Sequence, residues 1–330
     1  MRQLLQGQEA AIVDAVRRSY LAHRSGLSFV PHSTFLTFPG GRSDRVIALP
    51  AYLGGEFETA GIKWISSFPG NLELGLERAS AVVILNSIAT GRPEAILEGS
   101  VISAKRTAAS AALAAFALHA DRKEKRVGLV GCGAINFEIV RFLHSVFPNL
   151  SELVLFDLER SRAEQFAEMC AVEFGFAGKV AGDLFHVFEA AALVSLATTA
   201  SEPYISSLPE INEPRTILNI SLRDLAPELI INADNVVDDV DHVCRARTSL
   251  DLAAQLSGNR HFIRCSLADV LTSPVPPRED ACLTTIFSPF GLGILDLAVS
   301  KLVCELAQTH KIGTIVPSFL PDQLKQVCAV

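Results

Sequence analysis

The sequence has neither the cysteine pattern of a disulfide-bonded protein nor that of a zinc site. Its seven cysteines are an odd number, they are scattered along the chain, and no two form a Cys-x-x-Cys pair. A disulfide framework needs paired cysteines at regular spacing, and structural zinc sites usually need them in close pairs. The sequence therefore predicts reduced thiols, a cytoplasmic protein and no metal site.

An excess of positive charge is also absent. The chain has 29 Lys and Arg against 36 Asp and Glu, a formal net charge of -7, and no basic stripe. Proteins that bind nucleic acids usually concentrate Lys and Arg on one face to meet the phosphate backbone. We therefore expect no nucleic-acid partner.

Long hydrophobic runs are missing as well. Residues 1–6 lack the apolar core of a signal peptide, and the longest apolar run, 108–118, contains Ser110 and is too short to span a bilayer. A hydrophobic content of 49% nevertheless indicates a generous buried fraction. We expect a soluble chain with no membrane partner, and its 330 residues suffice for two domains.

The most informative motif present is a glycine turn after an apolar strand, at Gly131 and Gly133. Glycine has no Cβ, so the backbone can approach a pyrophosphate closely. The following helix, with Ala134 and Ile135 in its first turn, would offer free N–H groups to that pyrophosphate. The third glycine of the dinucleotide fingerprint is replaced by Asn136. The pattern predicts a nucleotide site.

A second apolar strand, 152–156, ends in Asp157 about one βα unit after the glycines. An acid at this place accepts the ribose hydroxyls of the adenosine half of a dinucleotide. Its charge would repel a 2′-phosphate, so NAD is predicted in preference to NADP. Arg160 and Arg162 could weaken that repulsion, or they could simply form the solvated first turn of the next helix.

The first third of the chain predicts a helix followed by a sheet. Residues 8–23 show the apolar periodicity of a helix. Five short strand-like segments follow, separated by Gly, Pro and Asn turns, and this spacing favours an antiparallel or mixed sheet over βα repeats. The five segments are residues 34–38, 45–49, 59–65, 81–86 and 94–98.

An alanine-rich helix is expected over residues 103–119, with Ser103 as its N-cap. Strand–helix alternation begins only at Arg126, and a last helix is expected over residues 291–309. The first part of the chain has consecutive strands and the second part alternates strands with helices, so we expect an antiparallel or mixed sheet followed by a parallel one.

We therefore predict an α/β protein with two domains. A mixed α+β substrate-binding and dimerisation domain covers residues 1–105, and the C-terminal segment 300–330 returns to it. A Rossmann-type NAD-binding domain covers residues 106–299. The cleft between the two domains is the expected ligand site.

Lys63 is the first candidate for chemistry. It interrupts the apolar run Gly-Ile-Lys-Trp-Ile, and a buried ammonium must be paired or neutralised. Such a lysine can act in acid/base catalysis or hold a substrate carboxylate. The alternative is a lysine on the solvated face of a strand.

Three further charged residues stand near expected strand or helix ends. Arg45 opens an apolar strand and could bind an anion or pair with Asp44 at the surface. Arg106, in the first turn of the alanine-rich helix, could hold a carboxylate with both its guanidinium and the helix N-terminus, or lie on the surface. Asp224 is expected at the carboxyl edge of the parallel sheet, where ligands bind, or as a helix cap before Pro227.

These motifs together resemble the ornithine cyclodeaminase/μ-crystallin family over nearly the whole chain. The resemblance implies catalytic roles for Lys63 and Asp224, and a clamp of Arg45 and Arg106 on the substrate α-carboxylate. It also implies a homodimer in which the sheet domains of two subunits close into one barrel. The matching segments are residues 44–50, 61–63, 106–109, 131–133 and the loop bearing Asp224. The further cofactor contacts assigned with the glycine turn are Thr107, Thr198, Thr199 and Ser221.

A narrower resemblance is to the branch of this family that oxidises N-[(2S)-2-amino-2-carboxyethyl]-L-glutamate. It is carried by residues 54–56, 61–65 and 77–86, and by Ile135, where cyclodeaminases tend to have Gln. The implied reaction moves a hydride from the glutamate α-carbon to NAD and hydrolyses the resulting imine. The products are 2-oxoglutarate, L-2,3-diaminopropionate and NADH, and the partner enzyme in the pathway would be a phosphoserine-dependent synthase.

The branch resemblance adds substrate contacts. Arg78 and Ser80 would bind the substrate, although Arg78 could instead pair with Glu73 or Glu77. Lys63 would polarise or protonate the reacting centre.

Asp224 would take a proton from the attacking water. The preceding Arg223 stands where the family often has a smaller residue. It could be another substrate contact, or it could shift the register of Asp224.

Three other functions stay open from the sequence. An ornithine cyclodeaminase would convert ornithine to proline and ammonia without net NADH. A ketimine or imino-acid reductase would run in the opposite direction. A ligand-binding protein with a bound nucleotide would not turn over at all, although such a protein has no need for Asp224.

Overall fold

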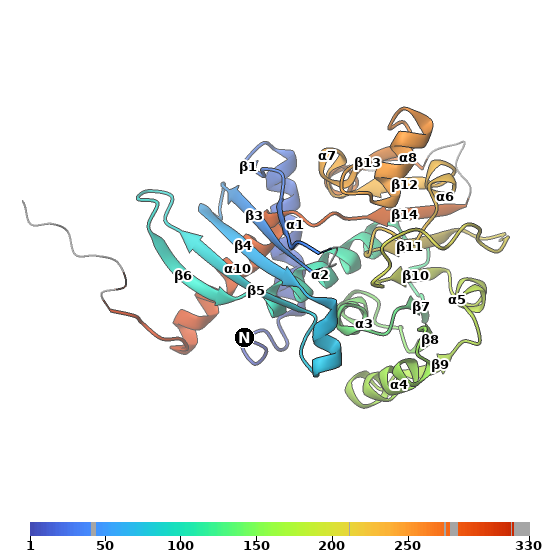
Figure 1. Ribbon diagram of the computed structural model, residues 1–330. Coiled ribbons are helices and arrows are strands. Elements are labelled where there is room, and N and C mark those ends of the chain that lie inside the picture. The colour runs from blue at the N-terminus through green and yellow to red at the C-terminus, as the bar shows by residue number, and fades with distance from the viewer. Residues whose placement is uncertain (41–43, 211, 274, 278–282, 318, 320–330) are drawn as a thin grey trace, which may run out of the picture.

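The computed structural model has two sheets side by side, with a long helix between them (Figure 1). It describes the whole chain except residues 41–43, 211, 274, 278–282, 318 and 320–330, and except the side chain at position 72. One sheet is antiparallel and the other is parallel with helices packed on it. The predicted α/β class, with a Rossmann-type domain beside a second sheet domain, is confirmed.

The antiparallel sheet comes from the first part of the chain, and its strand order is β1-β3-β4-β5-β6, with β2 also paired to β3. All five segments predicted from the sequence are strands, and only the two-residue β1 was missed. The register places Arg45 opposite Ser67, and Leu49 opposite Lys63. The bounds are β1 Ser28–Phe29, β2 Thr34–Thr37, β3 Arg45–Leu53, β4 Thr59–Ser67, β5 Ala79–Asn86 and β6 Pro93–Glu98.

The parallel sheet has the order β13-β12-β14-β11-β10-β7-β8-β9. The chain moves outward from β7 to β9 and then returns to the other side of β7 with β10. This reversal between β7 and β10 is a topological switch point, where ligands bind in open parallel sheets. The bounds are β7 Arg126–Val130, β8 Glu152–Phe156, β9 Ala177–Val180, β10 Leu193–Leu196, β11 Arg215–Asn219, β12 Asp234–Val237, β13 Ile263–Ser266 and β14 Thr284–Ser288.

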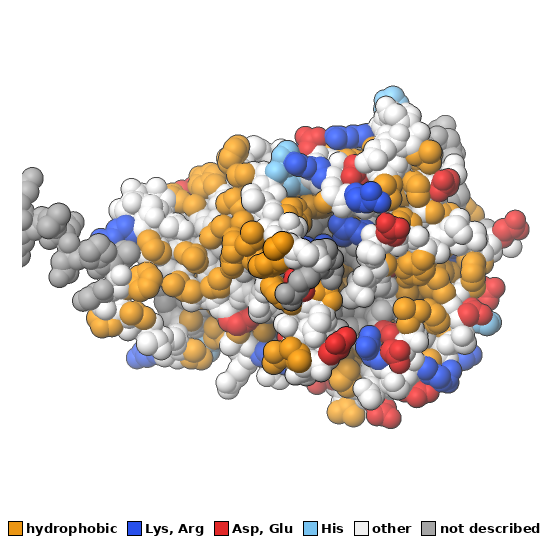
Figure 2. All heavy atoms as spheres, in the orientation of Figure 1, with side chains coloured by type: hydrophobic (Ala, Val, Ile, Leu, Met, Phe, Trp, Pro, Cys, Tyr) orange, Lys and Arg blue, Asp and Glu red, His pale blue; other side chains and the backbone are white. Residues whose placement is uncertain are grey.

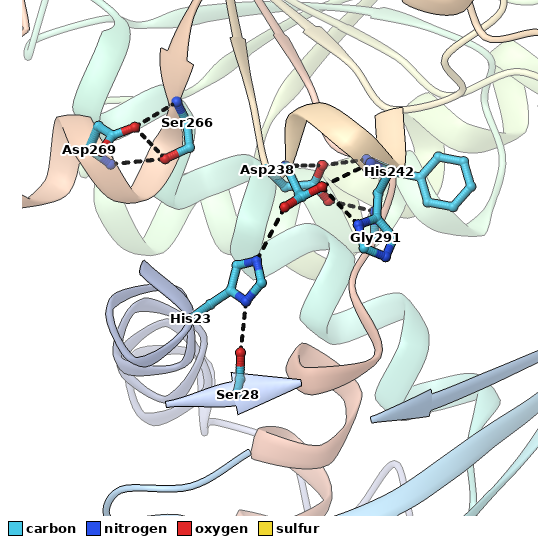
Figure 3. Close-up of polar contacts among 9 residues, drawn as sticks. His23, Ser28, Asp238, His242, Ser266, Asp269 and Gly291 are labelled. Atoms are coloured by element: carbon cyan, nitrogen blue, oxygen red, sulfur yellow. Dashed lines mark hydrogen bonds and ion pairs between the residues drawn. The ribbon is translucent and has the colours of Figure 1, made fainter. Parts of the chain in front are cut away.

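Helices cover both sheets. Polar side chains cap several of them at the N-terminus, as Asp183, Asp239, Thr248 and Ser266 each accept a backbone N–H. Ser266 and Asp269 form a complete capping box (Figure 3). The bounds are α1 Glu9–Arg24, α2 Ser100–Leu118, α3 Ala134–Val146, α4 Arg160–Phe174, α5 Leu184–Ala190, α6 Pro227–Ile231, α7 Val240–Val243, α8 Ser249–Ser257, α9 Leu267–Thr272, α10 Gly293–His310 and the short 3₁₀ helix η1 Pro69–Leu74.

Helix α2 lies at the centre of the molecule, against α1, α3 and α10 and against strands of both sheets. Its small alanine side chains let these neighbours approach closely, and the run from Ala111 to Ala115 is almost completely buried. One hydrophobic core therefore continues from the antiparallel sheet through α2 into one face of the parallel sheet. A second core lies on the other face.

The predicted start of α2 was wrong. The helix begins at Ser100 with Gly99 as its N-cap, and Ser103 lies inside it because its N–H donates to the Gly99 carbonyl. Arg106 consequently stands in the second turn, so the helix N-terminus is not beside it as expected. The side chain of Ser103 is engaged by Lys63 instead of capping the helix.

The length of α2 also corrects the sequence argument about membranes. With 19 residues and an apolar composition, the helix is long enough to cross a bilayer, whereas the run 108–118 suggested otherwise. Most of it is buried inside this fold, as expected for the core helix of a globular domain.

After β14 the chain crosses back to the first sheet. The crossing is held by Asp238 at the end of β12, which accepts the backbone N–H groups of Phe290 at 2.9 Å and Gly291 at 2.7 Å (Figure 3). Helix α10 then packs on α1 and on β3, β4 and β5. Nearby, His23 on α1 lies 3.4 Å from Asp239, so polar contacts also join the two halves here.

Candidate active site

Lys63 and Arg106 meet at one buried carboxylate. The Lys63 Nζ lies 2.8 Å from Asp296 Oδ2 and donates to Ser103 Oγ at 3.1 Å. The Arg106 Nε donates to the other oxygen of Asp296 at 3.1 Å. Lys63 is 2% exposed, so it does not lie on a solvated strand face, and Arg106 is not a surface arginine. Two cations share one anion, which leaves a net positive charge for an incoming carboxylate.

The environment of Lys63 suits acid/base chemistry. Burial, followed by the positive charge of Arg106, lowers the pKa of Lys63 from 10.5 to about 8, while Asp296 acts in the opposite direction. A group with such a pKa can both give and take a proton near physiological pH.

Asp296 was missed by the sequence analysis. It lies in α10, its side chain is fully buried, and it comes from a segment more than 200 positions away from Lys63. The available signal was a single carboxylate inside the apolar run Gly-Ile-Leu-Asp-Leu-Ala-Val. A charge in such a run requires a partner, just as Lys63 does.

Asp224 is the second buried acid of the site. Three hydroxyls donate to its carboxylate: those of Thr198, Ser221 and Tyr204, the last at 3.1 Å. Its backbone carbonyl also accepts the N–H groups of Tyr204 and Ile205. The alternative of a helix cap is wrong, because the N-cap of α6 is Ala226. Asp224 is therefore held rigidly in the loop after β11.

Four of the predicted cofactor contacts are residues with hydroxyl groups, and two of these hydroxyls bind Asp224. The hydroxyls of Thr198 and Ser221 are directed to Asp224, and their contact with a cofactor stays a prediction. Tyr204 was missed by the sequence analysis, since an isolated tyrosine in a loop gives no pattern. Thr107 donates to the Ser103 carbonyl at 2.8 Å, and Thr199 follows directly after Thr198; their cofactor roles also stay predictions.

Arg45 and Arg78 lie together at one end of the antiparallel sheet. Arg45 is opposite Ser67 in the register, and the Ser67 hydroxyl accepts a hydrogen bond from Arg78 at 2.7 Å. Burial and the nearby charge of Arg45 lower the pKa of Arg78. Among the described residues neither arginine forms an ion pair with Asp or Glu, so the proposed surface pairings are not seen. Ser80 is close by and shares a hydrogen bond of 2.7 Å with Ser66.

The two glycines of the nucleotide turn have different reasons to be glycine. Gly131 has φ +87°, and a Cβ there would lie 2.5 Å from the Ala197 carbonyl oxygen, so the fold itself requires glycine. A Cβ at Gly133 would meet no atom within 4 Å. The space above Gly133 is therefore open for a ligand, and within the described part of the chain no side chain caps α3 at its N-terminus, where Ala134 and Ile135 stand.

Asp157 and Asn136 complete the turn. Asp157 stands directly after β8 and accepts the Cys132 N–H at 2.8 Å, which fixes the acid beside the glycines. Asn136 donates to the Gly131 carbonyl at 2.7 Å and accepts from the Ser195 hydroxyl. The residue in place of the third glycine thus fastens the turn to β10, and the set fits a dinucleotide.

Together, this fold and this site are those of an α/β enzyme that uses a dinucleotide, with a Rossmann-type parallel sheet beside a second, antiparallel sheet. The chain belongs to the ornithine cyclodeaminase/mu-crystallin family, which it matches over residues 8–311. The family resemblance seen in the sequence is confirmed.

Three relatives describe the range of the family. An N-((2S)-2-amino-2-carboxyethyl)-L-glutamate dehydrogenase of Staphylococcus aureus is 30% identical over 318 residues, which cover 92% of this chain and 91% of that protein. The Thermococcus litoralis Delta(1)-pyrroline-2-carboxylate reductase, solved with NADH and L-proline, is 26% identical with a TM-score of 0.86, over 96% and 98% of the two chains. An archaeal alanine dehydrogenase dimer with bound NAD is 26% identical with a TM-score of 0.81, over 94% and 95%.

Proposed function

We propose that this protein is an NAD-dependent dehydrogenase that cleaves N-[(2S)-2-amino-2-carboxyethyl]-L-glutamate to 2-oxoglutarate and L-2,3-diaminopropionate. The observation that carries the proposal is that Arg45, Arg78 and Arg223, all half-buried, have no ion pair with Asp or Glu among the described residues. A substrate with three carboxylates suits such a site better than ornithine or alanine, each of which has one. The similarity to the Staphylococcus aureus enzyme supports the same substrate.

NAD is the proposed cofactor, and when bound it would accept the hydride from the glutamate α-carbon. Gly131, Gly133 and the start of α3 would hold its pyrophosphate, and Asp157 would accept the ribose hydroxyls. The negative charge of Asp157 disfavours a 2′-phosphate.

Lys63 and the clamp prepare the substrate for oxidation. Arg106, with Arg45, would hold the α-carboxylate, and orientation of this kind contributes much of the rate of a hydride transfer. A protonated amine cannot give up a hydride from its neighbouring carbon, because the nitrogen lone pair must form the new C=N bond. Neutral Lys63 would take that proton first.

Asp224 acts on the imine that results. It would accept a proton from the water that attacks the imine carbon, while Lys63 returns its proton to the departing nitrogen. The three hydroxyls that bind Asp224 keep its carboxylate in one orientation. Water, substrate and NAD are consumed, and 2-oxoglutarate, diaminopropionate, NADH and a proton are formed.

The substrate assignment is tested by incubating the purified protein with NAD and N-[(2S)-2-amino-2-carboxyethyl]-L-glutamate without oxygen. We expect NADH and diaminopropionate to form one for one. Parallel reactions contain ornithine with NAD, and Δ1-pyrroline-2-carboxylate with NADH. Proline from ornithine without net NADH, or rapid reduction of the pyrroline alone, would replace the proposal by a cyclodeaminase or an imine reductase.

The pH dependence of the oxidation should report Lys63. Because its pKa is lowered to about 8, Lys63 is protonated below that pH and neutral above it. We expect kcat/KM to rise about tenfold per pH unit below pH 8 and to level off above it. Arg106→Gln removes a charge that lowers this pKa, so the break should move to higher pH. A break that stays in place would belong to another group, such as the substrate amine.

The glycine turn offers a matched pair of substitutions. Gly131→Ala should destabilise the fold by at least about 1–2 kcal/mol, because alanine is strained at positive φ and its Cβ collides with the Ala197 carbonyl. Gly133→Ala should leave the melting temperature almost unchanged and weaken NAD binding at least about tenfold. Thermal unfolding and NADH fluorescence measure the two effects. Equal NAD affinity in Gly133→Ala would place the pyrophosphate elsewhere.

We also propose a homodimer formed through the antiparallel sheets. Strand β6 lies at the edge of its sheet, and an unpaired edge is normally covered or paired. A groove beside it is lined by exposed apolar side chains, including Ile96, Ile312 and Ile315. A second copy of this chain is the proposed occupant, and the similar archaeal alanine dehydrogenase was solved as a dimer. Sedimentation of the purified protein measures its oligomeric state, and a monomer would contradict the dimer. We also propose a cytoplasmic location and, as the partner enzyme in the pathway, a phosphoserine-dependent synthase.

A further inference from the structure

The segment between β14 and α10, residues 289–292, crosses from the parallel sheet to the antiparallel one, and we call it the strap. It forms no helix or strand, and α10 begins directly after it. On the face drawn in Figure 2, basic side chains lie around a hollow near the middle of the molecule, between the two sheets of Figure 1. The strap therefore crosses between the two halves of the molecule shortly before Asp296, which binds Lys63 and Arg106.

The guanidinium group of Arg106 lies against the backbone of the strap. A Cβ at Gly291 would lie 2.8 Å from Nη1, 3.1 Å from Nη2 and 3.4 Å from Cζ of Arg106. Gly291 also has φ +94°, so the position favours glycine for its conformation as well as for the space that the guanidinium occupies. Asp296 accepts the Nε–H of Arg106 at 3.1 Å. The guanidinium is thus held at its Nε and against Gly291, while among the described residues Nη1 and Nη2 have no hydrogen-bond partner and can bind a carboxylate.

Asp238 holds the strap from the side of the parallel sheet. It follows directly after β12 and is 1% exposed. Its Oδ1 accepts the N–H of Phe290 at 2.9 Å and that of Asp239 at 2.8 Å, and its Oδ2 accepts the N–H of Gly291 at 2.7 Å (Figure 3). Within the described chain this carboxylate forms no ion pair. A buried acid is costly unless its oxygens are hydrogen-bonded, and two of the three hydrogen bonds of Asp238 are to the strap.

The far end of the strap is fixed on the antiparallel sheet. A Cβ at Gly293, the first residue of α10, would lie 3.1 Å from the carbonyl oxygen of Leu49, which is opposite Lys63 in the register. Helix α10 therefore begins in close contact with the sheet that carries Lys63, and it packs on β3, β4 and β5. Because this end cannot move freely, loss of the contacts with Asp238 would shift the part of the strap at Gly291, on which the guanidinium lies.

We propose that Asp238 is a positioning residue for Arg106. Its carboxylate holds Gly291 against the guanidinium, so that Nη1 and Nη2 meet the substrate carboxylate in one orientation. Asp238 acts through Arg106, and the contact of Gly291 with the guanidinium is the step between them. The inference rests on the proposed function in one respect, which is that Arg106 binds the carboxylate at the reacting carbon.

The test is a double-mutant cycle on the binding of 2-oxoglutarate and of pyruvate to the enzyme–NADH complex, followed by NADH fluorescence. Arg106→Gln should weaken both ligands by about tenfold to a hundredfold, because a charged hydrogen-bond donor is lost. Asp238→Asn should weaken both by about tenfold and leave NADH affinity unchanged, since in either orientation of the amide one N–H of the strap loses its acceptor. The double variant should bind no more weakly than Arg106→Gln alone, because Asp238 acts through the guanidinium.

Gly291→Ala tests the same contact from the other side. Its Cβ would displace the guanidinium, so it should weaken both ligands at least as much as Asp238→Asn, and only while Arg106 is present. This variant carries the test if Asp238→Asn does not fold. The matched control is Asp234→Asn, because Asp234 lies in β12, is also 1% exposed, and pairs with Arg264 at 2.9 Å, away from the strap. It should lower the melting temperature without changing either affinity.

The outcomes separate the positioning role from the proposed function. Additive losses in the double variant, or full affinity in both Asp238→Asn and Gly291→Ala, would overturn the positioning role. An equal loss in Asp234→Asn would overturn it as well, because the effect would then follow general stability. Unchanged binding by Arg106→Gln would refute the carboxylate-binding role in the proposed function, and the inference with it. A protein that binds pyruvate but not 2-oxoglutarate, with the same non-additive losses, would keep the inference and refute the proposed substrate.

Discussion

Replacing Asp224 by Asn should reduce the turnover of the substrate by about a hundredfold to ten-thousandfold, the usual contribution of a positioned acid or base. The amide keeps the size of the side chain, and its oxygen can still accept from Thr198 and Tyr204, while its NH2 group takes the place of the oxygen that faces Ser221. It cannot accept the proton of the attacking water. The steady-state rate of NADH formation measures the loss, and NADH fluorescence should show nearly unchanged cofactor binding.

A matched control separates this effect from a loss of charge. Asp183 is an exposed N-cap on α5, and Asp183→Asn should retain the full rate with only a small loss of stability. If Asp224→Asn kept most of the wild-type rate, the proton acceptor would be a different group. If it lost both the rate and the NADH affinity, Asp224 would be a structural residue of the cofactor site.

Replacing Lys63 by Ala should have an effect of similar size, again about a hundredfold to ten-thousandfold on turnover. The substitution leaves Asp296 paired with Arg106 alone, so the buried carboxylate keeps one cation and the fold should survive. The space left by the side chain should admit a small amine. We therefore expect methylamine to restore part of the rate, and the restored rate should increase with the concentration of the neutral amine.

The control for Lys63→Ala is measured in the same way, as the rate of turnover with and without methylamine. Lys179→Ala, at an exposed position on β9, should change neither the rate nor its response to methylamine. A Lys63→Ala protein that turns over normally would contradict the acid/base role. A protein that folds and binds NADH, but is insensitive to methylamine at every pH, would limit Lys63 to electrostatic attraction of the substrate carboxylate.

The sequence predicted the local features of this fold well. The alternation of apolar residues located the five main strands of the antiparallel sheet. The strand, glycine and acid pattern located the glycine turn between β7 and α3 and the acid Asp157 after β8. These predictions depend on neighbours within about one βα unit, and such patterns are set by local backbone geometry and by burial of one face.

Contacts between distant segments were harder to predict. The start of α2 was placed three residues late because Ser103 resembles a cap, while in the structure its hydroxyl accepts a hydrogen bond from Lys63. The partner of Lys63 was not identified, because Asp296 lies on the last helix and no sequence pattern connects the two. The hydroxyl groups around Asp224 come from two different strand ends and a loop.

By itself, the sequence determined the class of fold, the place of the glycine turn before α3, and which charged residues stand in apolar surroundings. The tertiary structure alone decided which of these charges neutralise one another. Lys63 and Arg106 share Asp296, whereas Arg45, Arg78 and Arg223 share no carboxylate among the described residues. The physical reason is that ionic interactions act through space over a few ångströms, and only the packing of α10 against the first sheet and α2 brings Asp296 within that range of Lys63 and Arg106.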